Sequence, residues 1–88
     1  MIVENVLEWI ADWNEEALLA DGFEDAILGM CERFGNNPVV AYNYLKCIDI
    51  LIQRDGMTHE EAEEYFSFNV LGAWMGNGTP VFVTLYVP

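Results

Sequence analysis

Acidic side chains outnumber basic ones fifteen to three in this chain of 88 residues, and the formal net charge is −12. A chain stays unfolded when high net charge is joined to low hydrophobicity, but here 53% of the residues are hydrophobic. The sequence therefore predicts a folded protein that must place its carboxylates outside an apolar core. At this length we expect one small globular domain over residues 1–88.

The same charge limits the partners of the protein. A strongly negative surface repels nucleic-acid phosphates and anionic lipid head groups, and it attracts the basic grooves with which other proteins hold DNA or RNA. We therefore expect no direct binding to nucleic acid, no binding to a membrane, and a protein partner with a basic surface. The high apolar content also indicates a partner interface or a homodimer.

Three features predict a cytoplasmic protein with reduced thiols. No apolar run approaches the ~20 residues of a membrane-spanning helix. No basic residue precedes the first apolar positions, as it would in a signal peptide. Cys31 and Cys47 are too few for a disulfide framework.

The first twenty residues have the pattern of an amphipathic helix with an acidic stripe. Its carboxylates fall within an arc of roughly 120° and belong to Glu4, Glu8, Asp12, Glu15 and Glu16. Residues four apart rise ~6 Å along a helix, so the row would repeat at a spacing comparable to successive phosphates along a DNA strand. This predicts a surface that competes for a basic channel; the alternative is an ordinary solvated helix face.

Two tryptophans, Trp9 and Trp13, flank this stripe. One interpretation is that they pack against the core. The other is that they anchor a protein interface, where Trp is enriched among the residues that contribute most to binding. We include both among the predicted partner-binding residues.

Residues 23–42 fit a helix and a β-hairpin equally well. Apolar residues at positions 23, 27, 30 and 34 would line one helical face. However, Gly29 disfavours a helix by about 1 kcal/mol relative to Ala, and the Gly-Asn-Asn-Pro sequence at 35–38 indicates a turn.

The second half of the chain gives clearer signals. Asn43 is expected to cap a helix that ends near Gly56, and Thr58 with Glu61 matches a capping box at the start of a helix that runs toward Trp74. Residues 76–80 interrupt that helix, and residues 81–87 form the strongest strand pattern of the chain.

A second group of carboxylates lies on this last helix, at Glu60, Glu61, Glu63 and Glu64. The first two favour the helix N-terminus, where negative charge complements the dipole. Glu60, Glu63 and Glu64 are predicted as further partner-binding residues, and they would strengthen the acidic stripe if both groups face the same way.

The sequence offers little for catalysis or for a cofactor. Two Cys and one His lack the paired spacing of a zinc site, and there is no Asp-rich calcium loop. Cys47 is expected in the core, so a nucleophilic Cys–His pair with His59 is not predicted. The glycines at 76 and 78 lack the Lys and the strand-before-helix order of a phosphate-binding loop. We therefore expect no cofactor and no enzyme.

Residues 55–74 read Asp-Gly-Met-Thr-His-Glu-Glu-Ala-Glu-Glu-Tyr-Phe-Ser-Phe-Asn-Val-Leu-Gly-Ala-Trp, and Gly-Thr-Pro-Val-Phe follows at 78–82. This pattern resembles a family of small phage and prophage proteins that has no assigned biochemical role. The likeness extends over residues 21–83 and includes Pro-Val-Val-Ala-Tyr at 38–42. It implies a hairpin for residues 26–42 and a phage setting, and it supplies no catalytic residues. The acidic stripe lies outside it.

Together these observations predict an α+β fold: an N-terminal helix, a β-hairpin, two helices and a C-terminal strand, with a small antiparallel sheet of about three strands covered by helices. The predicted function is that of a non-enzymatic phage protein, which binds a host nucleic-acid-binding defence protein of the CRISPR or restriction type and inhibits it. The alternative is a structural or regulatory homo-oligomer whose acidity serves solubility only.

Overall fold

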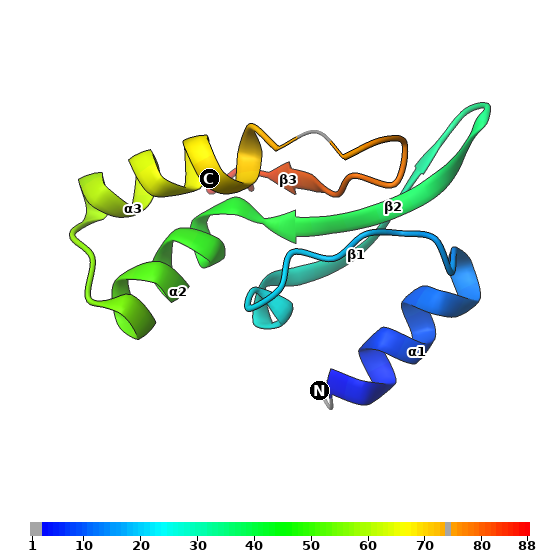
Figure 1. Ribbon diagram of the computed structural model, residues 1–88, viewed down its shortest axis with the longest axis horizontal. Helices are drawn as coiled ribbons and strands as arrows, with labels where there is room; N and C mark the ends of the chain where they lie inside the picture. Colours follow the sequence, from blue (N-terminus) through cyan, green and yellow to red (C-terminus); the bar gives the residue numbers. More distant parts are fainter. Residues whose placement is uncertain (1–2, 74) are drawn as a thin grey trace.

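The computed structural model describes residues 3–73 and 75–88, with side chains from residue 6 onward. The predicted α+β fold and its order of elements are confirmed (Figure 1). The elements are α1 (Val3–Trp13), a 3-10 turn η1 (Glu24–Ala26), β1 (Ile27–Arg33), β2 (Asn36–Asn43), α2 (Tyr44–Asp55), α3 (His59–Phe66), a π-helical turn η2 (Ser67–Leu71) and β3 (Val81–Val83). Trp74, toward which the last helix was predicted to run, lies outside the described residues.

The predicted helix over the first twenty residues is too long, because α1 ends at Trp13. Asn14 provides the stop. Its side-chain oxygen accepts the N–H of Glu16 at 3.0 Å, and its amide nitrogen donates to the carbonyl of Pro38 at 2.9 Å. Asn side chains favour such local turns over continued helix.

The segment after Asn14 is held by distant parts of the chain. The N–H of Leu18 donates to the carbonyl of Gly78, and the N–H of Ala20 donates to the hydroxyl of Tyr42. A Cβ at Gly78 would lie 2.8 Å from the carbonyl oxygen of Glu16, so this close approach requires glycine. These tertiary contacts override the helical pattern of residues 14–20.

The sheet has the order β1-β2-β3. Strands β1 and β2 form the antiparallel hairpin, which closes through the two-residue turn Phe34-Gly35 with Gly35 at φ +77°. Strand β3 pairs with β2 in parallel, so the prediction of an antiparallel sheet is wrong for this pair. Residues 44–80 pass through α2 and α3 before the chain returns to β2, and a parallel pair requires a long crossover of this kind.

The C-terminal strand is also shorter than the predicted 81–87. Val83 pairs with Asn43, and α2 begins at the next residue, Tyr44. Because β2 ends at Asn43, residues 84–88 have no part of β2 with which to pair.

Capping residues define both C-terminal helices as predicted. Asn43 accepts the N–H of Lys46, and Gly56 ends α2 in the left-handed conformation at φ +70°. In α3 the Thr58 hydroxyl accepts the N–H of Glu61, while the Glu61 carboxylate accepts the N–H of Thr58 at 2.8 Å.

The capping box predicts the effect of a single substitution. Thr58→Ala removes the acceptor for the N–H of Glu61 and is expected to lower the free energy of unfolding by about 1 kcal/mol. Urea denaturation followed by circular dichroism measures this, with Thr58→Ser as the control that keeps the hydroxyl. Equal losses in the two variants would show that the cap does not stabilise α3.

The core lies between the sheet and the helices α2 and α3, and it also includes Val6 and Ile10 of α1. Phe66 is completely buried, and its ring packs edge-to-face with Phe23, Tyr44 and Phe82 at centroid distances of 5.7, 5.5 and 4.9 Å. Tyr42 from β2 stacks on Phe82 at 5.4 Å. The aromatic group therefore joins β2, β3 and both C-terminal helices in one cluster.

Candidate protein-binding surface

The acidic row on α1 is shorter than predicted. Glu8 and Asp12 are exposed one helical turn apart on α1. Glu4 belongs to α1, but its side chain lies outside the described ones. Glu15 and Glu16 are exposed in the turn after the helix, so the regular four-residue spacing does not continue past Asp12. The prediction of a straight row of five carboxylates is thus wrong. The structure has the pair Glu8 and Asp12 on α1, followed by Glu15 and Glu16 in a turn.

Trp9 and Trp13 lie beside this pair and form an aromatic unit of their own. Their rings meet edge-to-face, with centroids 6.2 Å apart and planes at 68°. The side chains are 45% and 47% exposed, so each packs on the protein with one part and faces solvent with another. The ring of Trp9 lies 4.0 Å from the position that a Cβ on Gly29 would occupy. Both rings are thus partly packed on the protein, and their exposed parts leave the interpretation as an interface anchor a prediction.

The three basic side chains of the chain are all engaged within the protein. Lys46 lies 3.9 Å from Asp49, and Arg54 binds the carboxylate of Asp55 at 3.1 Å. Arg33 donates to two backbone carbonyls. Among the described side chains, Asp49 and Asp55 are the carboxylates that pair with Lys or Arg, so the acidic pair on α1 keeps its charge uncompensated.

The second acidic group has mixed roles. Glu61 is used by the capping box, and Glu63 lies 3.5 Å from His59. Glu60 and Glu64 are exposed and line a hollow of about 460 Å³ beside Tyr65 and Phe68. Helices α1 and α3 lie at opposite ends of the molecule in Figure 1, so the two acidic groups do not merge into one patch.

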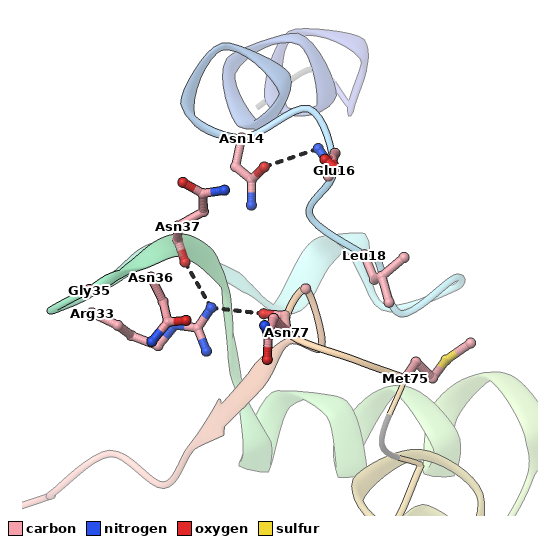
Figure 2. A pocket seen from close by; sticks show the side chains of 10 residues that line it. Asn14, Glu16, Leu18, Arg33, Gly35, Asn36, Asn37, Met75 and Asn77 are labelled. Carbon is pink, nitrogen blue, oxygen red and sulfur yellow. Dashed lines mark hydrogen bonds between the residues drawn. The ribbon is translucent and has the colours of Figure 1, made fainter.

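A polar depression of about 690 Å³ lies near the tip of the hairpin (Figure 2). At its centre Arg33 donates from Nη2 to the carbonyls of Asn37 and Asn77, both at 2.8 Å. The guanidinium therefore ties the hairpin to the loop that leads into β3. Asparagine side chains and Glu16 supply most of the remaining polar lining.

This depression was not predicted from the sequence. The turn signal at residues 35–38 lies next to the actual turn, Phe34-Gly35, but it is wrong for residues 36–38, which belong to β2. Asn77 is 44 residues away from Arg33 in the chain, and no local pattern connects them. The lining contains one carboxylate and no Cys or His, which leaves it without a nucleophile–base pair of the kind used in covalent catalysis.

The groups whose pKa values are shifted most clearly take part in core packing or in contacts within the protein. Burial raises the pKa of the Cys47 thiol to about 12, so it stays protonated and unreactive at neutral pH. Burial also raises the pKa of Tyr42, although the N–H of Ala20 bonded to its hydroxyl acts in the opposite direction. The hydrogen bond from Arg54 lowers the pKa of the exposed Asp55. Within the described part of the chain, no three His, Cys, Asp or Glu side chains gather as metal ligands would.

None of the helices in the residues that the structure describes combines the length and the apolar character needed to cross a bilayer. Comparisons of the chain with protein-family models, with curated proteins and with solved structures found no match.

Proposed function

We propose that this chain is a non-enzymatic phage protein that acts in the host cytoplasm, where it binds a basic, nucleic-acid-binding surface of a host defence protein and blocks it. The observation that carries the proposal is the outer side of α1, where exposed Glu8 and Asp12 stand beside the half-exposed pair Trp9 and Trp13. Carboxylates without internal cations can pair with Lys and Arg of a partner, and a rigid aromatic pair can supply apolar contact at the same place.

The two parts of this surface have different roles in binding. Complementary charge speeds the encounter and selects the partner, whereas buried aromatic contacts slow dissociation. Glu15 and Glu16 add charge beside the pair without extending its helical geometry. Glu60, Glu63 and Glu64 lie at the other end of the molecule and would reach a second area of a large partner. Such a surface resembles nucleic acid in charge only; its spacing does not reproduce a phosphate row.

The proposal is tested by capture of partners from lysate of the host cell. The native chain and a Glu8→Gln/Asp12→Asn variant serve as baits, and a NaCl gradient elutes the partners for mass spectrometry. We expect the variant to bind a nucleic-acid-binding protein on the order of tenfold more weakly, with earlier elution, because two charge pairs are lost and the rest are screened by salt.

A matched control carries Asp25→Asn and Glu32→Gln, which remove the same charge from exposed positions outside both acidic groups. Equal weakening by the control and by the α1 variant would show that net charge, and not the α1 surface, controls binding. Recovery of no nucleic-acid-binding protein on any bait would reject the proposal and favour the alternative function, a structural or regulatory homo-oligomer. The exposed apolar side chains of the C-terminal segment, described next, are the observation that favours this alternative.

A further inference from the structure

Charge and exposed apolar surface are divided between two parts of the chain. Every acidic and basic side chain lies between Glu4 and Glu64, and residues 65–88 carry none. This uncharged segment contributes eight of the fourteen large hydrophobic side chains that are exposed in the described residues, among them Tyr65, Phe68, Leu71 and Met75. Large apolar side chains that are exposed close together mark an interaction site more often than side chains exposed singly.

Part of this apolar surface surrounds a depression of about 270 Å³. Its lining includes the buried ring of Phe23 and the partly buried side chains of Val70 and Phe82, and the exposed side chains of Leu19 and Met75 lie around it. An apolar cavity of about 150 Å³ is large enough to hold a benzene molecule. The depression therefore has room for an aromatic side chain.

An exposed aromatic ring stands next to this depression on the same protein. Phe68 is 79% exposed in η2, and it shares a neighbouring hollow with Tyr65, which also lines the depression. A protruding group beside a hollow is self-complementary under a two-fold axis, since each copy can insert its own ring into the other. Two-fold dimers are the commonest oligomers of soluble proteins.

The charges around the depression favour a second copy over a basic partner. Its charged lining residues are Asp21 and Arg54, and Arg54 is already bound to Asp55 and to the carbonyl of Gly22. The depression itself offers a basic partner one carboxylate, whereas Glu60, Glu61 and Glu64 border Phe68 in the neighbouring hollow. A second copy, at a net charge of −12, meets less repulsion at the depression, where one acidic and one basic side chain line the wall, than at the acidic surface of α1; the carboxylates beside Phe68 leave some repulsion between the protomers.

We propose that this surface binds a second copy of the chain in a two-fold dimer, in which Phe68 of each protomer fills the depression of the other. The inference goes beyond the proposed function and is independent of it. The dimer leaves Glu8, Asp12, Trp9 and Trp13 free, so it would present the α1 surface twice.

Sedimentation equilibrium of the full chain tests the dimer over a range of protein concentrations. We expect a monomer–dimer equilibrium whose dissociation constant decreases as NaCl rises from about 0.1 M to about 1 M, because salt screens the remaining repulsion between the acidic protomers. Salt is expected to weaken the complex with a basic partner, so the two interactions respond in opposite directions.

Substitutions locate the interface. Phe68→Ser is expected to raise the dimer dissociation constant roughly tenfold or more, because the inserted ring is the central apolar contact. Phe34→Ser is the matched control, since Phe34 is fully exposed in the hairpin turn, outside the uncharged segment. Met75→Ser tests the rim of the depression independently.

A chain that stays monomeric at every concentration and salt would overturn the proposal and assign the surface to another occupant. A dimer that is unaffected by both Phe68→Ser and Met75→Ser, or that dissociates as salt rises, would overturn it as well. Circular dichroism of each variant confirms that the fold is kept.

Discussion

Replacing Phe66 by Ala is expected to lower the free energy of unfolding by about 3–5 kcal/mol. The ring is fully buried and makes edge-to-face contacts with Phe23, Tyr44 and Phe82. Its loss removes apolar burial and leaves a cavity between α2, α3 and the sheet. Since a domain of this size has about 5–15 kcal/mol of stability in total, the variant should be largely unfolded at moderate urea concentrations. Urea denaturation followed by tryptophan fluorescence and circular dichroism measures the loss.

Phe34→Ala is the control for this experiment, because it makes the same chemical change at a fully exposed position. We expect its effect to stay within about 0.5 kcal/mol. A loss below about 1 kcal/mol in Phe66→Ala would contradict the central place given to Phe66 in the core.

The stability of the protein is expected to fall above about pH 9, because burial raises the pKa of the Cys47 thiol to about 12. The unfolded chain releases this proton near its usual pKa of about 8.5, whereas the folded chain holds it. Folding is therefore favoured fully below the unfolded pKa, and the contribution is lost as pH rises, at about 1.4 kcal/mol per pH unit. Urea denaturation at a series of pH values measures the slope.

Cys47→Ala identifies the group responsible. The variant should be less stable at neutral pH because it leaves a small cavity, but its stability should change little between about pH 9 and about pH 10. Tyr42, whose pKa is also raised by burial, adds to the loss at still higher pH. An unchanged slope in Cys47→Ala would assign the pH dependence to another group.

Local signals in the sequence were sufficient for the helices α2 and α3. The caps at Asn43, Gly56 and Thr58 depend on hydrogen bonds and backbone angles within a few residues of each other, and all three are present. The residue pattern alone did not decide between a helix and a hairpin for residues 23–42, because the spacing of the apolar residues favoured a helix and the turn signal at 35–38 favoured a hairpin. Pairing between the two strands supplies hydrogen bonds to the backbone N–H and C=O groups of both strands. The spacing of apolar residues in the sequence does not reveal this pairing.

Other features depend on partners far away in the chain. The end of α1 is set by Asn14 bonded to Pro38, and the parallel direction of β3 is set by the path of residues 44–80. The same reason explains the errors at the predicted surface. The sequence pattern placed Glu15 and Glu16 on the N-terminal helix. The hydrogen bonds of Leu18 to Gly78 and of Ala20 to Tyr42 prevent that helix from continuing to these residues. The acidic positions that need only local helix, Glu8 and Asp12, are exposed as expected.

The long crossover between β2 and β3 also affects the order in which a growing chain can complete its fold. Tyr42 and Phe66 leave the ribosome before Phe82, the ring that packs on both. Contacts between distant residues form late, since the loop between them must first be closed. During synthesis one side of the aromatic cluster formed by the hairpin and the helices α2 and α3 therefore stays open until Phe82 has been translated and β3 can pair with β2.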